Sequence, residues 1–236
     1  MGIDLAADPT RTGLAVVSGN GRCIVEDVHV GADDDDVVEA ISTADKAGVD
    51  VPMGWPDRFV QLIQAHARGA VAAPASTGPE WRRGLAMRVT DRMVHRATGL
   101  TPLSVSTDRI AHPAMRWAGI EARLRDIGVD VARDGSGAVC EVYPAAALRR
   151  WSLPHRGYKG AKNAGERSAL VVALSEKLAR LEWNGHRDLC VADDNALDAV
   201  LAALVAREVS HGRGEPPPEE LRGTARREGW IWLPEA

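Results

Sequence analysis

The sequence predicts an α/β protein built on a mixed sheet whose first three strands are antiparallel. Residues 1–17 contain two short strands joined by a tight turn at residues 8–13, and a third strand spans residues 22–30. Two further short apolar runs, at 47–52 and 138–143, follow helical patterns. A strand reached through a helix in this way joins the sheet in parallel by a right-handed crossover. We therefore expect a five-stranded sheet flanked by helices.

The length of 236 residues and the composition suit one ordinary globular domain. A net charge of −4 gives no global positive field, so a polyanion would have to be bound by a local basic patch. The three cysteines are far apart among apolar residues, which indicates buried side chains rather than a disulfide framework or a zinc site. The chain shows no signal peptide and no apolar run of membrane-spanning length, so we expect a cytoplasmic protein without a membrane partner.

The first strand carries a carboxylate in its middle. Apolar residues flank Asp4 on both sides, as expected in a central strand. A charge at such a position costs free energy unless it is paired, hydrogen-bonded or bound to a metal. Asp4 is therefore either the cap of a nearby turn or a metal ligand at the edge of the sheet.

The next elements bring a second carboxylate to the same sheet. The Asn-Gly pair at 20–21 predicts a hairpin, and four aspartates at 33–36 favour the start of a helix that runs to about residue 44. The strand at 47–52 should lie parallel to the first strand. It carries Asp50 near its carboxyl end, where ligands bind in sheets of this kind.

Residues 53–135 are predicted to form a mostly helical insertion within a single domain that spans residues 1–236. A helix at 57–68 is followed by a long loop at 69–84, rich in Ala, Pro, Ser and Gly. Loops of this length are often lids or disordered segments. The helix predicted at 107–127 repeats apolar residues at the spacing of a core helix.

The helix predicted at 85–97 places Arg88 and Arg92 four residues apart on one face. Two explanations stay open for this face. It is either a solvated surface paired with acids such as Asp91, or a patch that captures phosphate.

Two strands are predicted around a Gly-Ser-Gly turn, at 129–132 and at 138–143, the latter as the fifth strand of the sheet. The fifth strand carries Glu141 among apolar residues. After a helix at 144–150, the segment 152–165 is irregular and basic. Its composition fits a substrate-facing loop and an ordinary surface loop equally well.

Two long helices follow, at 166–181 and from about 193 to 208. Asp194 and Asp198 are four residues apart in the last helix and project from the same side. Asp194 suits a helix start, whereas Asp198 stands among apolar neighbours and is the better candidate for a functional carboxylate. A polar tail at 212–227 leads to a short apolar segment.

Acids thus occur on the first, fourth and fifth strands and on the last helix, in an element order that is ribonuclease-H-like. The segments that carry a family resemblance are Gly-Ile-Asp-Leu-Ala at 2–6, Val-Asp-Val-Pro-Met-Gly-Trp-Pro at 49–56, Glu-Val-Tyr-Pro at 141–144, Tyr-Lys at 158–159 and Asp-Asn-Ala-Leu-Asp-Ala at 194–199. In this order they resemble the domain-of-unknown-function family 429 over almost the whole chain. That family is described as predicted nucleases with a ribonuclease-H-like fold.

The resemblance implies a divalent-metal site. It places Asp4, Asp50 and Asp198 as metal ligands and catalytic residues, Asp194 as a neighbouring ligand, and Glu141 as a catalytic residue among or beside them. Carboxylate oxygens suit Mg²⁺ or Mn²⁺. Two such ions about 4 Å apart could activate water and stabilise the leaving oxygen of a phosphodiester. The implied activity is that of a metal-dependent nuclease or phosphodiester hydrolase.

Substrate binding is assigned to a local basic patch. Arg88, Arg92, Lys159 and Lys162, together with Tyr158, would contact nucleic acid or a nucleotide, and the basic side chains would hold the phosphates that flank the scissile bond.

Two other functions stay open. A chain that shares the fold but has a degenerate site would be a binding or regulatory protein, which the net negative charge favours. A sugar-kinase-like ATPase would begin with a similar hairpin, but the sequence holds one such sheet and neither a P-loop nor a Rossmann glycine fingerprint. The substrate and the oligomeric state are not determined by the sequence.

Overall fold

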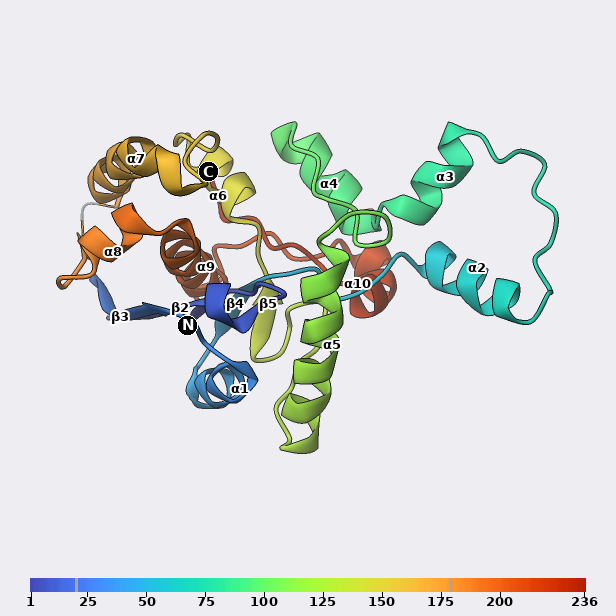
Figure 1. Ribbon diagram of the computed structural model, residues 1–236, viewed down its shortest axis with the longest axis horizontal. Coiled ribbons are helices and arrows are strands. Elements are labelled where there is room, and N and C mark those ends of the chain that lie inside the picture. Colours follow the sequence, from blue (N-terminus) through green and yellow to red (C-terminus); the bar gives the residue numbers. More distant parts are fainter. Residues whose placement is uncertain (20, 179) are drawn as a thin grey trace.

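The computed structural model describes residues 1–19, 21–178 and 180–236, with a mixed sheet at the centre (Figure 1). The order of the strands is β5-β4-β1-β2-β3-β6. β2 is antiparallel to β1 and to β3, whereas β4 is parallel to β1 and to β5. The strands are β1 (Gly2–Asp4), β2 (Gly13–Ser18), β3 (Cys23–Val30), β4 (Ala47–Asp50), β5 (Val139–Glu141) and β6 (Leu181–Glu182).

The antiparallel start and the parallel fourth and fifth strands are confirmed, but the described sheet has six strands rather than five. The missing strand, β6, pairs in parallel with β3 and contains only two residues. Such a strand is too short to show an alternation of apolar and polar residues. Its Leu181 also fits the apolar spacing of the preceding helix, which ends at Lys177. Asn20 of the predicted hairpin turn lies outside the described residues.

The strand predicted at 129–132 is not formed. Asp130 instead organises a turn, because its side chain accepts the Ala132 N–H and its carbonyl accepts the Ala138 N–H. These hydrogen bonds use backbone groups that a strand would have paired with a neighbour.

Helices occupy most of the remaining chain. The α-helices are α1 (Asp34–Thr43), α2 (Asp57–Ala67), α3 (Pro79–Ala86), α4 (Val89–Thr98), α5 (Ala111–Asp126), α6 (Pro144–Arg150), α7 (Ala164–Lys177), α8 (Arg187–Ala192), α9 (Asp194–Ser210) and α10 (Arg222–Glu228). The 3₁₀ helices are η1 (Pro9–Arg11), η2 (Ala161–Asn163) and η3 (Glu219–Leu221).

The acidic start of α1 is confirmed as a helix cap. Asp33 accepts the N–H groups of Asp35 and Asp36, and the Asp36 side chain accepts the N–H of Asp33. Such a capping box satisfies backbone donors that the first turn of a helix leaves free. These aspartates therefore need no metal to explain them.

The single helix predicted at 85–97 is two helices, α3 and α4. The chain is extended at Arg88, whose backbone N–H and guanidinium both bond to Asp91. The preceding loop ends before residue 79 because Pro79 starts α3, a position that suits the fixed φ of proline.

The two faces of the sheet are covered by different helices (Figure 1). The apolar face of β1 and β4 marked by Ile3 and Val49 forms one core with α1 and α5, to which Trp117 contributes a fully buried ring. The opposite face packs against α9, with α6, α7 and α8 around it. Four of the apolar residues predicted to share one face of this helix, Ala114, Trp117, Ile120 and Leu124, are buried in α5, whereas Ile127, just beyond its end, is 59% exposed.

Residues 53–135 contain α2 to α5 and no strand. α5 belongs to the sheet core, whereas α2, α3 and the segment between them extend away from the sheet (Figure 1). The predicted polar tail contains α10, and Ile231 beyond it forms a parallel bridge with Glu141 of β5.

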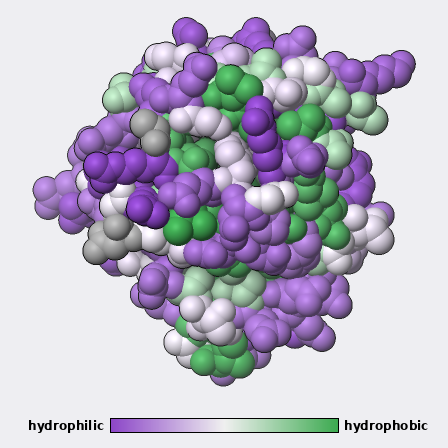
Figure 2. All heavy atoms as spheres, turned by 90° about the vertical axis from the view of Figure 1, so that its left-hand side faces the viewer, coloured by the Kyte–Doolittle hydropathy of each residue, from purple (hydrophilic) through white to green (hydrophobic). Residues whose placement is uncertain are grey.

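The face on the β3, α7 and α8 side is mostly hydrophilic, with apolar side chains in separate groups (Figure 2). Among the helices of the described residues, none combines the length and the apolar character needed to cross a lipid bilayer.

Candidate functional site

The pairing of β1 with β4 brings two of the predicted carboxylates together. The strands are parallel and in register, so Asp4 is the direct partner of Asp50. Side chains alternate between the faces of a sheet, which puts Asp4 on the face of Gly2, and Asp50 on the face of Gly48. That face is covered by α9.

Glycines on the sheet let α9 lie directly against it. A Cβ atom at Gly2 would come within 2.1 Å of the carbonyl oxygen of Ala199, and one at Gly48 within 2.4 Å of that of Ala202. Only a strand without side chains at these points accommodates a helix backbone so close. The fifth residue of α9, Asp198, is thereby buried beside the ends of β1 and β4.

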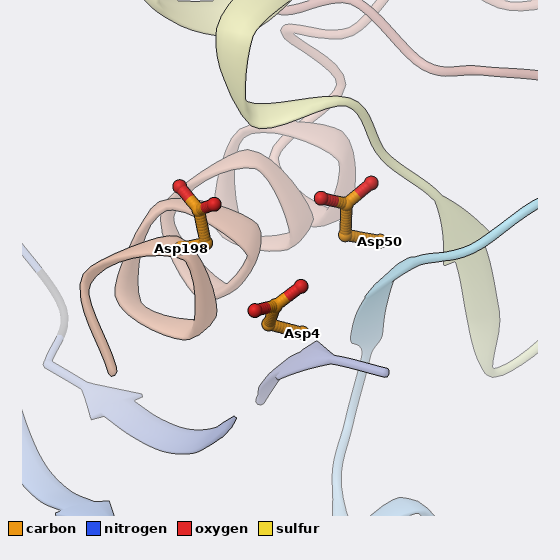
Figure 3. Close-up of side chains that lie close together, drawn as sticks. All are labelled: Asp4, Asp50 and Asp198. Carbon is orange, nitrogen blue, oxygen red and sulfur yellow. The ribbon is translucent and has the colours of Figure 1, made fainter. Parts of the chain in front are cut away.

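Asp4, Asp50 and Asp198 form a carboxylate triad (Figure 3). Each offers one oxygen atom, and these three atoms lie within 4.8 Å of one another. The three residues come from two strands and a helix that are distant in the sequence. The structure therefore brings together three of the four aspartates that were predicted as ligands, without Asp194.

Two neighbouring residues, Tyr158 and Lys159, bind the carboxylate of Asp198. The Tyr158 hydroxyl donates to Oδ1 at 2.8 Å, and the Lys159 Nζ lies 2.6 Å from Oδ2. The buried guanidinium of Arg167 fixes this segment, because it donates to the carbonyl oxygens of Tyr158 and Gly160. Arg167 was not identified from the sequence, since its partners are carbonyl groups and leave no signature in side-chain identity.

The electrostatics of the triad disfavour three negative charges. Burial raises the pKa of Asp4 well above its usual range, and the carboxylates of Asp198 and Asp50 raise it further. Burial also raises the pKa of Asp50 to about 7, against the opposing effect of Lys159. The pKa of Asp198 is raised by burial too, although Lys159 and Tyr158 act in the other direction.

Lys159 supplies the positive charge nearest to the triad. Partial burial opposes its charged form, but the carboxylates of Asp198, Asp50 and Asp4 outweigh it and raise the pKa of Lys159. One ammonium against three carboxylates leaves an excess of negative charge, which requires a cation or shared protons. Three hard oxygen donors from separate elements are a donor set that fits Mg²⁺ or Mn²⁺.

Asp194 and Lys162 lie outside the triad. Asp194 accepts the Gly160 N–H through Oδ2 at 3.1 Å, so it steadies the Tyr158–Lys159 segment from the start of α9. Lys162 is exposed in η2, three residues beyond Lys159.

Glu141 lies next to the site but is engaged elsewhere. Its two oxygens accept from the Arg88 guanidinium at 2.8 and 2.6 Å, and Oε2 also accepts the Met53 N–H. Arg88 completes the arrangement through Asp91, and all three side chains are buried. In this position Glu141 anchors the start of α4 to β5, and the Arg88 guanidinium is occupied by protein partners rather than open to a phosphate.

Arg92 lies at a different place from the triad. It is half-buried on α4, and its guanidinium reaches only the Met87 carbonyl, at 3.4 Å. It lines a separate cavity of about 410 Å³ with Arg83 and Arg96. Arg88 and Arg92 therefore do not share one exposed face.

A cavity of about 400 Å³ opens directly beside the triad. Asp50, Tyr158 and Lys159 belong to its wall, together with His155 and Arg156 of the same basic segment. The basic segment 152–165, for which a substrate-facing loop and an ordinary surface loop were both open, therefore contributes to the wall of a cavity beside the triad. Arg109, which precedes α5, also lines the cavity and was not identified from the sequence, because nothing near it in the chain marks it.

Comparison with known proteins gives one match, to a family model described as a protein of unknown function (DUF429). The match covers residues 2–222, which include all three members of the triad. No curated protein and no solved structure matches the chain. Since the family model spans most of its length, the chain belongs to the DUF429 family of proteins of unknown function.

Proposed function

We propose that this protein is a divalent-metal-dependent phosphodiester hydrolase of the ribonuclease-H-like type, a nuclease in the broad sense. The observation that carries the proposal is the triad of Asp4, Asp50 and Asp198, whose oxygens lie within 4.8 Å of one another. The strand arrangement, with three antiparallel strands followed by two parallel ones and a long acidic helix, supports the same fold type.

The triad would hold Mg²⁺ or Mn²⁺ through one carboxylate oxygen of each aspartate. When bound, the ion supplies an activated water and a positive charge beside the developing negative charge of the reaction. The register of β1 with β4 holds Asp4 against Asp50, and Tyr158 fixes the orientation of Asp198. These constraints keep the three carboxylates preorganised, as a metal site requires.

Lys159 would bind the substrate phosphate. Its raised pKa keeps the ammonium charged at neutral pH, and its side chain is 55% exposed although its Nζ contacts Asp198. An ammonium that bridges from the carboxylates toward solvent can attract a phosphate oxygen to the site without leaving Asp198.

A second candidate function rests on the same lysine. Because Lys159 already neutralises part of the triad, a protein with a degenerate site could use the ammonium in place of a metal and act as a binding or regulatory module. The two proposals differ in whether the triad binds a divalent ion at all.

Calorimetric titration with Mg²⁺ and Mn²⁺ separates them. We expect the wild-type chain to bind Mn²⁺ with micromolar to low-millimolar affinity, and the Asp4→Asn/Asp198→Asn variant to lose that binding. Asp45→Asn is the matched control, because Asp45 is exposed and distant from the triad, lining the cavity that contains Met1 and Lys46.

Hydrolysis is tested on the same proteins. Wild type and Asp45→Asn should cleave a phosphodiester substrate with Mn²⁺ and stop when EDTA is added, whereas the double variant should be inactive. Wild-type protein that binds no divalent ion, with or without an oligonucleotide present, would contradict the hydrolase and favour the degenerate site.

A further inference from the structure

The cavity beside the triad continues the candidate site away from the metal ligands. It holds about 400 Å³ and shares Asp50, Tyr158 and Lys159 with the carboxylate cluster. Its other walls come from the segment before α5 and from the start of α6. A group bound at the triad would therefore have the rest of its molecule in this cavity.

Two arginines in the wall of the cavity are not engaged in ion pairs with carboxylates of the described residues. Within the described residues, Arg109 and Arg156 make no ion pair, and the ring of His155 has no hydrogen-bond partner. Elsewhere in the fold arginines such as Arg133 and Arg213 are paired with carboxylates. With Lys159, the two arginines put positive charge on the cavity wall, which favours an anion close to the triad.

Another part of the wall is apolar. It includes Pro52, Pro102, Ile110, Tyr143 and Leu103, and Leu103 is 47% exposed. Apolar and aromatic surfaces next to a few cations are the usual lining of a site for a planar ring that carries a charged group. An inorganic phosphate would leave this wall uncovered.

The volume restricts the ligand further. A cavity of about 400 Å³ lies at the lower end of the ~300–1,000 Å³ range of small-molecule sites. It can hold one base with its sugar and phosphate but not consecutive base pairs of a duplex. The ligand chemistry that matches size, charge and apolar wall together is a single nucleotide.

We propose that this cavity binds one nucleotide unit, with its base against Tyr143, Leu103 and Pro102 and its phosphate toward Arg109, Arg156 and Lys159. The inference deepens the proposed hydrolase and rests on it for the chemistry. The unit is either a free nucleotide ester or the terminal nucleotide of a single strand, because an internal nucleotide would bring neighbours that the cavity cannot hold.

The reaction at such a site releases one nucleotide at a time. The hydroxyl of water adds to phosphorus, the P–O ester bond breaks, and the leaving oxygen takes the remaining proton. Cleavage should consequently need a strand end or a small ester.

Calorimetry on the full-length chain tests binding, with adenosine 5′-monophosphate, ribose 5-phosphate and inorganic phosphate as probes, in EDTA and again in Mg²⁺. We expect the nucleotide to bind at least ten times more tightly than ribose 5-phosphate in both conditions. Leu103→Ser should remove most of this preference, and Arg156→Ala should weaken the binding of the nucleotide about tenfold. Arg68→Ala, an exposed arginine at the end of α2, should change nothing.

Equal binding of the nucleotide and ribose 5-phosphate would overturn the inference. Assays on linear and circular single-stranded DNA then distinguish the two sources of the nucleotide unit. If only the linear form is degraded, the substrate is a strand end. If neither form is degraded while the nucleotide binds, the substrate is a free nucleotide ester. Equal cleavage of both forms would overturn the inference but leave the hydrolase intact. If the chain binds the nucleotide in EDTA but binds no divalent ion, the nucleotide site in the cavity is supported and the proposed hydrolase is contradicted.

Discussion

Asp4, Asp50 and Asp198 lie where three negative charges lower the stability of the fold. Each lies where its charged form is disfavoured, and burial is the largest cause of the raised pKa of each. A group that is harder to ionise in the folded than in the unfolded chain reduces stability at any pH where it must ionise. Functional sites commonly carry such a cost.

The pH dependence of stability should report this cost at Asp50. Its pKa is about 7 when folded, against an ordinary value of 3.8. Well below pH 3.8 the group is protonated in both states and costs nothing. As the pH rises to about 7, only the unfolded chain ionises freely, so the metal-free protein loses stability. Above pH 7 the loss is complete. We expect it to reach about 1–4 kcal/mol.

Urea denaturation of metal-free wild type and Asp50→Asn between pH 4 and 8 measures the effect. The difference in unfolding free energy between them should move in favour of Asp50→Asn as the pH rises, then level off above about 7. Asp45→Asn should follow the wild type throughout. Parallel curves for wild type and Asp50→Asn would show that Asp50 is not held in a charge-disfavouring position.

At the scale of elements, the site depends on how closely α9 lies on the sheet. The small side chains of α9, such as Ala199 and Ala202, face glycines on the strands, and this contact sets the position of Asp198 relative to Asp4. A helix held away from the sheet by one methyl group would move Asp198 from the other two carboxylates.

Gly48→Ala should therefore damage both stability and metal binding. The new Cβ would lie 2.4 Å from a backbone oxygen of α9, which cannot rotate away as a side chain can. We expect a loss of about 1–3 kcal/mol of unfolding free energy and a weaker Mn²⁺ affinity, measured by thermal unfolding and calorimetry.

Gly119→Ala provides the matched control for that substitution. Gly119 lies within α5 and has no atom within 4 Å of an added Cβ, so alanine should leave Mn²⁺ binding unchanged and stabilise the helix by up to about 1 kcal/mol. If Gly48→Ala behaved like Gly119→Ala, the contact between α9 and the sheet would not position the triad.

Over the whole molecule, the sequence predicted the groups whose local surroundings make them unusual. Asp4 and Asp198 stand among apolar residues, and the sheet order that joins them follows from the pattern of strands and helices. The buried ion pairs of Arg88 and the role of Glu228 could not be identified in this way. Arg88 meets Glu141 from 53 positions away, and Glu228 accepts the Val89 N–H across 139 positions. Such pairs exist only once the chain is folded.

These distant pairs unite the helical insertion with the sheet. Arg88 joins the start of α4 to β5, and Glu228 at the end of α10 accepts from the first residues of both α2 and α4, Asp57 and Val89. Arg88 also donates to the Glu228 carbonyl, so the four helix and strand ends meet at one buried cluster. We expect the molecule to unfold as one unit because of it.

Arg88→Met should destabilise the whole chain by about 3–5 kcal/mol, because it leaves the buried carboxylates of Glu141 and Asp91 without their cation. Arg92→Met is the control on the same helix, where the single long contact to Met87 predicts a change of at most about 1 kcal/mol. Adding Glu141→Gln to Arg88→Met should recover part of the loss, since it removes one uncompensated charge. Urea denaturation measures the unfolding free energy of all three variants.

An Arg88→Met variant as stable as Arg92→Met would mean that the insertion is held to the sheet by apolar packing alone. The buried ion cluster would then not stabilise the contact between insertion and sheet.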